Sequence, residues 1–202
     1  DVKALEFVSL RDGRYRRKNL RDKLGDSLAD TRDALWGVDL NRNFPTSFQA
    51  GKCEVLEVFA GPAAASEPET AAIAAFLAGA FNADNPLLGS LDVHNNSQKL
   101  LVTNGVPGVG GNYDSHVQRA AGEMARRLRE GGRTYGRTEL SGGPTGSFRT
   151  HLAHTFKVPS ITLELPFDTH LQTSFFVQDN DIDGIYAGMR LAALTLIDWA
   201  TG

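Results

Sequence analysis

The feature that most constrains the fold of this 202-residue chain is its alternation of apolar runs with helical segments. Apolar runs that fit strands cover residues 2–10, 87–93, 100–103 and 158–165. Helical patterns cover residues 66–81, 115–130 and 181–199. Such alternation is typical of proteins in which helices pack on a sheet of mainly parallel strands. We therefore predict an α/β fold with a mixed, largely parallel central sheet and helices on both faces.

The segment from Ser66 to Phe81 has the clearest helix start. Ser66 can cap the first turn, and Pro68 suits the first helical position. Glu67 and Glu69 would face the positive end of the helix dipole. We interpret both acids as structural parts of a well-capped helix.

The composition restricts the class of protein. The chain contains no apolar run long enough to cross a bilayer and no signal-like segment. We therefore expect a soluble protein, cytoplasmic or secreted, with no membrane partner. A net charge of -3 argues against general nucleic-acid binding. Cys53 is the only cysteine, which excludes an internal disulfide and a cysteine-based zinc site.

Asn41 and Arg42 lie in the octet Gly37–Phe44, which reads as a polar turn after an apolar residue. Arginine offers planar paired donors and asparagine adds another, so the two side chains suit a carboxylate ligand. The alternative is an ordinary solvated loop, because Asn and Gly are common in turns.

Residues 11–23 contain seven Lys and Arg side chains. This basic segment fits a solvated surface loop, and it also fits a polyanion-binding site. Only Tyr15 adds an aromatic ring between the charges, and no nucleic-acid-binding motif accompanies them.

His94 and Glu164 are polar residues at the ends of two apolar strands. Side chains at the carboxyl end of a strand can reach the crevice beyond the sheet. Asp92 precedes His94 by two residues on the same strand face and could orient its imidazole. A buried acid is costly, so Glu164 should be paired, protonated or functional. The alternatives are a hydrogen-bonded structural histidine and a strand-end glutamate in a salt bridge.

In their order along the chain, Arg17, Asn41-Arg42, His94 and Glu164 resemble the motifs of the zinc carboxypeptidase family. This family includes the pancreatic carboxypeptidases A and B and bacterial cell-wall peptide carboxypeptidases. The resemblance extends from the first strand to the closing helix. It implies a zinc-dependent metallocarboxypeptidase that hydrolyses C-terminal peptide bonds. The implied substrate is a peptide or cell-wall peptide with a free C-terminal carboxylate.

The resemblance also implies catalytic and metal-binding roles. His94 matches the third zinc ligand, and Glu164 matches the general base that takes a proton from zinc-bound water. Arg17, rather than its neighbour Arg16, matches the arginine that stabilises the oxyanion, an effect worth roughly 3 kcal/mol.

The substrate-binding part of the resemblance is less uniform. Asn41 and Arg42 match the pair that holds the terminal carboxylate. Thr138 occupies the place of the family's mobile tyrosine, and Tyr135 is the nearest substitute that could contact substrate. The specificity-pocket position near residues 144–146 carries no charge, which disfavours a strict preference for a basic or acidic terminal residue.

Two of the family's three zinc ligands have no counterpart in this sequence. They come from a His-x-x-Glu motif upstream of the first strand, and no histidine precedes His94. His151 and His154 are three residues apart, and we interpret them as helix-surface residues. We therefore expect one carboxypeptidase-like domain over residues 1–202 that lacks the ligand-bearing N-terminal part. A separate N-terminal segment could supply these ligands, and a start at Asp1 fits a processed or truncated product.

Two other functions remain open from the residues alone. A metal-free carboxypeptidase-like module could use Asn41 and Arg42 to bind peptide C-termini. A polyanion-binding domain could use the basic segment 11–23, with binding that falls steeply as salt rises.

Overall fold

The computed structural model describes residues 18–19, 37–50, 58–95, 97–103, 105–106, 112–133, 137–141, 145–165 and 182–202. The chain divides into two compact units, which we describe separately. Unit 1 comprises Asp1–Asn85 and Pro144–His151, and unit 2 comprises Pro86–Gly143 and Leu152–Gly202. The strand predicted over residues 2–10 lies outside the described residues.

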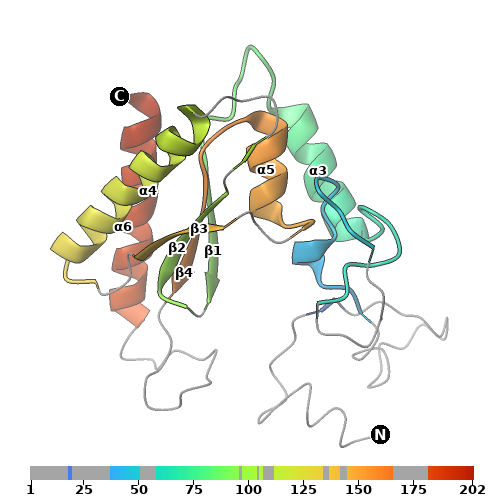
Figure 1. The fold of residues 1–202 in the computed structure, drawn as a ribbon, viewed down its shortest axis with the longest axis horizontal. Coiled ribbons are helices and arrows are strands. Elements are labelled where there is room, and N and C mark those ends of the chain that lie inside the picture. The colour runs from blue at the N-terminus through green and yellow to red at the C-terminus, as the bar shows by residue number, and fades with distance from the viewer. Residues whose placement is uncertain are drawn as a thin grey trace, which may run out of the picture. The chain divides into compact units, whose positions relative to one another are not determined.

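Unit 2 is built on a four-stranded sheet with the order β1-β4-β2-β3 (Figure 1). The strands are β1 (Ser90–Asn95), β2 (Lys99–Thr103), β3 (Arg137–Ser141) and β4 (Ser160–Leu165). The pairs β1–β4 and β2–β3 are parallel, whereas β2 and β4 are antiparallel. The predicted mixed, largely parallel α/β sheet is therefore confirmed. The apolar runs predicted β1, β2 and β4, whereas β3 was not predicted.

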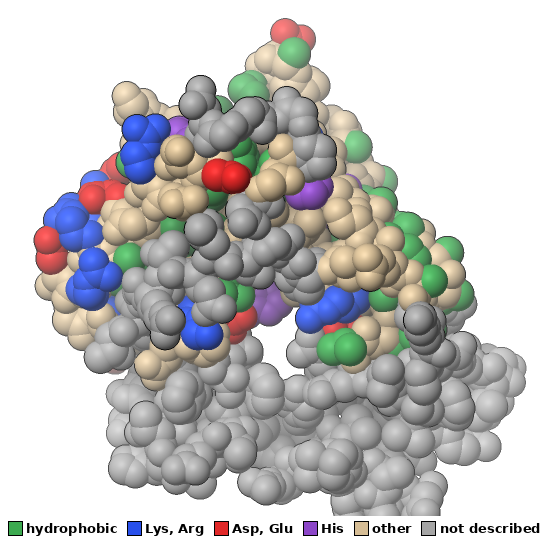
Figure 2. Space-filling model, in the orientation of Figure 1, with side chains coloured by type: hydrophobic (Ala, Val, Ile, Leu, Met, Phe, Trp, Pro, Cys, Tyr) green, Lys and Arg blue, Asp and Glu red, His purple; other side chains and the backbone are tan. Residues whose placement is uncertain are grey.

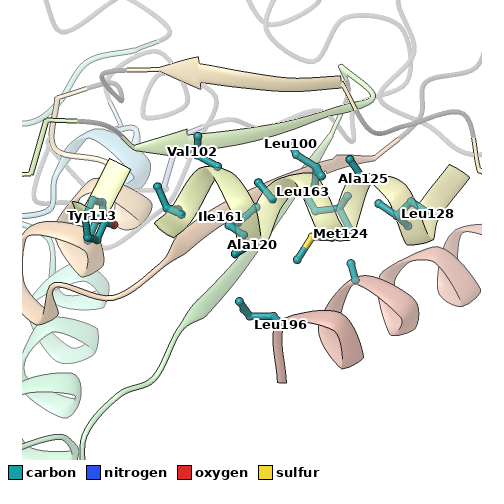
Figure 3. Close-up of a cluster of buried hydrophobic side chains, with 14 of the residues drawn as sticks. Leu100, Val102, Tyr113, Ala120, Met124, Ala125, Leu128, Ile161, Leu163 and Leu196 are labelled. Carbon is teal, nitrogen blue, oxygen red and sulfur yellow. The ribbon is translucent and has the colours of Figure 1, made fainter. Parts of the chain in front are cut away.

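One face of this sheet is apolar and is covered by helices α4 (Asn112–Glu130) and α6 (Ile182–Thr201), which lie side by side (Figure 1). The core includes residues from β2, β4, α4 and α6, namely Leu100, Val102, Ile161, Leu163, Met124, Leu128 and Leu196 (Figure 3). Burying a side chain of this size contributes about 1.5–3 kcal/mol. Such a core fixes which face of each strand is turned away from α4 and α6.

The sequence of α4 explains both its orientation and its end. Its buried residues recur at helical spacing, at positions 117, 120, 121, 124, 125 and 128. The helix stops at Gly131 and Gly132, as predicted. Gly132 has φ +76°, and Arg133 N–H donates to Leu128 O at 2.8 Å, which closes the last turn.

The outer surface of α4 carries charges of both signs. Figure 2 shows Lys and Arg side chains next to Asp and Glu side chains where α4 lies in Figure 1. Arg126 pairs with Glu123 at 2.6 Å, and Arg127 pairs with Asp198 of α6 at 2.6 Å. Arg127 also donates through Nε to Glu123 Oε1 at 2.9 Å. The hydrogen bonds that Glu123 accepts, first from Arg126 and then from Arg127, lower its pKa to about 2.

Unit 1 contains helix α3 (Pro68–Ala80), whose start differs from the prediction. Pro68 is at the first helical position, as expected, but Glu67 rather than Ser66 precedes it as the cap residue. The Ser66 hydroxyl instead donates to Glu67 Oε1 at 2.8 Å and accepts from Asn43 Nδ2 at 3.0 Å. The predicted Ser66 cap is therefore wrong, because Asn43 and the neighbouring Glu67 side chain occupy its hydroxyl.

Asn43 connects the octet Gly37–Phe44 to the start of α3. Its side chain is fully buried, and its Nδ2 donates to Ala60 O at 2.8 Å. Its Oδ1 accepts from Glu67 N–H at 3.2 Å and from the Thr70 hydroxyl. Glu67 is buried and paired within this network, which agrees with its interpretation as a structural acid.

Candidate functional site

The candidate residues of unit 2 lie on the polar face of the β1–β4 strand pair. The parallel register places His94 beside Glu164 and Asp92 beside Thr162. Paired residues of neighbouring strands project to the same face of a sheet, and residues two apart on one strand share that face. We refer to these four residues as the strand-pair site. Leu163, which lies between Thr162 and Glu164 on β4, belongs to the apolar core.

The His94 imidazole is oriented by its neighbour on β1. His94 Nε2 lies 3.0 Å from Asp92 Oδ2, so the predicted contact between the two is present. Thr162 Oγ1 donates to the same carboxylate oxygen at 3.4 Å. A carboxylate accepts hydrogen bonds, so it favours the neutral tautomer with the proton on Nε2. The His94 side chain is 34% exposed, which leaves it within reach of a ligand.

The candidate residues of unit 1 lie in a short 3-10 turn, η1 (Leu40–Arg42). Asp39 is buried and holds this turn, because its Oδ1 accepts from Asn41 N–H at 3.1 Å and its carbonyl accepts from Arg42 N–H at 2.9 Å. Arg42 Nη1 donates to Asn41 O at 2.7 Å, which keeps the guanidinium beside Asn41. We refer to Asn41 and Arg42 as the Asn-Arg pair.

The start of helix α5 (Phe148–Phe156) contacts the same turn. Phe148 N–H donates to Asn41 Oδ1 at 2.8 Å, and Phe44 N–H donates to Gly146 O at 2.9 Å. Gly146 has φ +68°, and a Cβ there would lie 2.0 Å from Arg42 O. Sequence reasoning missed both supporting residues. The only signal was a glycine before a helix, which does not reveal the partner.

His151 is buried in unit 1, so its interpretation as a helix-surface residue is wrong. Its side chain is on the face of α5 that packs against the octet, 5.5 Å from the Phe44 ring and with Nδ1 2.8 Å from Thr46 Oγ1. Only 7% of His151 is exposed, and this burial lowers its pKa. His154 is half-buried, and its pKa is lowered first by burial and then by the charge of Lys157.

Two predicted site residues, Arg17 and Tyr135, lie outside the described residues. Of the basic segment 11–23, the structure describes only Lys18 and Asn19. The roles inferred for this segment and for Tyr135 therefore remain predictions.

The described part of the chain does not complete a zinc site. No group of three His, Cys, Asp or Glu side chains suited to a metal ion occurs among these residues. Catalytic zinc usually has three protein ligands, and the zinc-binding role of His94 remains a prediction. The same part of the chain contains no helix with the length and apolarity of a membrane span.

Comparisons with solved structures show the fold. The bovine thrombin-activatable fibrinolysis inhibitor, solved with tick carboxypeptidase inhibitor, has a TM-score of 0.74 and 21% identity over 95% of this chain and 64% of its own. Carboxypeptidase A from Helicoverpa armigera has a TM-score of 0.74 and 20% identity over 97% of this chain and 48% of its own. A metallo-carboxypeptidase from Burkholderia cenocepacia has a TM-score of 0.51 and 16% identity over 80% of this chain and 39% of its own. The chain thus spans about half to two thirds of the length of the first two relatives.

The sequence itself identifies the family. None of the curated proteins matches the chain. The family profile described as zinc carboxypeptidase, however, matches residues 5–191, which is most of its length. This match confirms the resemblance seen in the motifs and agrees with the fold of the solved relatives. The chain therefore belongs to the zinc carboxypeptidase family.

Proposed function

We propose that this chain is part of a zinc-dependent metallocarboxypeptidase that hydrolyses the C-terminal bond of a peptide or cell-wall peptide. The observation that carries the proposal is the β1–β4 register, which places His94 beside Glu164. A histidine and a carboxylate side by side on the polar face of this strand pair suit metal binding and proton transfer.

His94 contributes one zinc ligand in this proposal. With Nε2 hydrogen-bonded to Asp92, Nδ1 is the nitrogen assigned to the metal. Zinc, when bound, would act as a Lewis acid that lowers the pKa of its bound water to about 7. The other ligands would come from a part of the protein beyond the described residues, which fits the greater length of the solved relatives.

Glu164 is the proton carrier. It accepts a proton from the attacking water and delivers it to the leaving amine, as a general base and then a general acid. Arg17 is proposed to stabilise the oxyanion, and Tyr135 to contact the bound substrate.

The Asn-Arg pair selects a chain end. The Arg42 guanidinium can bind both oxygens of a terminal carboxylate, and the Asn41 amide adds a further donor. An internal peptide bond offers no such charge, so the pair makes the enzyme an exopeptidase.

Glu164→Gln tests the proposed reaction. Made in the whole protein, it should lower turnover of a peptide substrate by about 10²–10⁴-fold, because the base is lost. Zinc content, measured by mass spectrometry with the intact mass, should stay unchanged. Glu69→Gln, at an exposed acid of α3, is the matched control and should keep full turnover. Full turnover in Glu164→Gln would remove Glu164 from the role of base.

A second candidate is a metal-free module that binds peptide C-termini. It is favoured by the Asn-Arg pair, which is held by described hydrogen bonds, whereas the described residues contain no group of three possible metal ligands. In that case peptide binding would require Arg42, resist chelators and survive Glu164→Gln. Zinc bound at one ion per chain would instead support the enzyme.

A further inference from the structure

We propose that the backbone N–H of Phe148 is a positioning group, which turns the Asn41 amide so that its N–H donors face an anionic ligand. The inference rests on the proposed carboxylate-binding role of Asn41 and Arg42. It adds a reason why this site selects a carboxylate over a neutral chain end.

The orientation of the Asn41 amide follows from its contact with α5. A side-chain amide has one acceptor end and one donor end. Phe148 N–H donates to Asn41 Oδ1 at 2.8 Å, so the acceptor end is directed at α5. The opposite orientation would bring two donors together and would leave the Phe148 N–H without this acceptor.

The Phe148 N–H is available because of its place in α5. The first N–H groups of a helix have no acceptor within the helix. Ser147 caps the turn, because its Oγ accepts from Thr150 N–H at 3.2 Å. This cap serves Thr150, and the Phe148 N–H is satisfied by Asn41 instead.

Further contacts hold the turn against the start of α5. Phe44 N–H donates to Gly146 O at 2.9 Å, and the rings of Phe44 and Phe148 lie 5.2 Å apart. The absence of a Cβ at Gly146 permits the close approach to Arg42 O. The turn and the start of α5 are thus joined at several points, so Asn41 is pre-oriented before a ligand binds.

The resulting ligand preference is specific. The Asn41 donor end and the Arg42 guanidinium both offer N–H groups, which match carboxylate oxygens. A C-terminal amide would present its own N–H donors to them. We therefore expect the site to prefer a peptide with a free C-terminal carboxylate over the same peptide with a C-terminal amide.

Phe148→Pro tests the positioning role. Proline removes the N–H, suits the first helical position and favours an extended residue before it, as expected of a cap such as Ser147. The matched control Phe148→Ala keeps the N–H and loses the ring. Affinities for an N-acetylated peptide and for its C-terminal amide would be measured by calorimetry on the whole protein. Phe148→Pro should lower the carboxylate preference by about tenfold to a hundredfold, while Phe148→Ala keeps it.

A second variant, Asn41→Asp, protects the test against a misfolded proline variant. One aspartate oxygen can still accept from Phe148 N–H, while the other replaces the donor end with a negative charge. The carboxylate preference should then be lost or reversed. A wild-type preference in Phe148→Pro would overturn the inference and leave the proposed function standing. A wild-type preference in Asn41→Asp would overturn the inference and remove Asn41 from carboxylate binding, with Arg42 left as the proposed anchor. A wild-type protein that binds both peptides equally would overturn the carboxylate-binding role itself.

Discussion

The Asn-Arg pair of unit 1 and the strand-pair site of unit 2 are held by different kinds of structure. The Asn-Arg pair depends on backbone groups of a loop and a helix start, with Gly146 allowing the close contact. The strand-pair site depends on the register of two strands, with side chains of Asp92 and Thr162 around His94. A loop site fails when its backbone moves, whereas a sheet site keeps its backbone when a side chain is removed.

Gly146→Ala should have the largest effect, because it acts on the backbone of unit 1. The new Cβ would lie 2.0 Å from Arg42 O, at φ +68°. We expect a loss of about 2–4 kcal/mol in the free energy of unfolding, together with weaker carboxylate binding. Chemical denaturation and peptide titration would measure both.

Gly79→Ala is the matched control for that change. Gly79 lies in α3, and a Cβ there meets no atom within 4 Å. The substitution should stabilise the protein by about 0.5–1 kcal/mol. Equal effects of the two substitutions would contradict the proposed role of the Gly146 contact.

Asp92→Ala should have an intermediate effect, confined to the side chain of His94. Without the carboxylate, the imidazole loses its preference for a proton on Nε2. Nitrogen NMR of the ring should show mixed tautomers. If the proposed zinc-binding role holds, the zinc affinity of the whole protein should fall roughly 10- to 100-fold. Asp92→Asn keeps an acceptor oxygen and serves as the control. An unchanged tautomer in Asp92→Ala would show that Asp92 does not orient His94.

The stability of unit 1 should decrease at acidic pH because of His151. Burial lowers its pKa in the folded protein below the ordinary 6.5, so the unfolded chain binds the proton more readily. The free energy of unfolding is therefore at its full value above pH 6.5. It decreases as the pH falls from 6.5 toward the lowered pKa, because only the unfolded chain then binds the proton. Each unit of difference between the two pKa values is worth about 1.4 kcal/mol.

Melting temperatures would test this prediction. They would be measured for wild type, His151→Gln and His154→Gln from about pH 5 to about pH 7.5, a range that includes the ordinary histidine pKa. The melting temperature of His151→Gln should depend less on pH than that of wild type. His154→Gln is the comparison, because His154 is less buried. A pH slope unchanged in His151→Gln would place the acid sensitivity elsewhere.

Glu123→Gln should have the smallest effect. Glu123 is paired with Arg126 and Arg127 on the surface of α4. Its pKa is lowered to about 2, so its contribution is present above 4.5 and is lost as the pH falls toward 2. Exposed pairs contribute little and are screened by salt. The small decrease in melting temperature at low salt should therefore vanish at high salt, and a decrease that persists would contradict this account.

The local elements could be predicted because they depend on neighbours in the chain. The apolar spacing of α4 and its Gly131-Gly132 stop specify where that helix lies and ends. Apolar runs specify β2 and β4, and the order of the motifs specifies the family. The strand β3 was missed because its residues, Arg137–Ser141, alternate too little in polarity to stand out.

The site depended on contacts that no local pattern contains. His94 meets Glu164 through a strand register that joins segments 70 residues apart, and Asn41 is oriented by a backbone N–H 107 residues away. Ser66 does not cap α3, because Asn43 and Glu67 bind its hydroxyl. Propensity and spacing act over a few residues, so the sequence by itself determined the elements and the family. Burial and hydrogen-bond partners arise only when distant segments pack, so tertiary structure alone decided the orientation of His94 and Asn41.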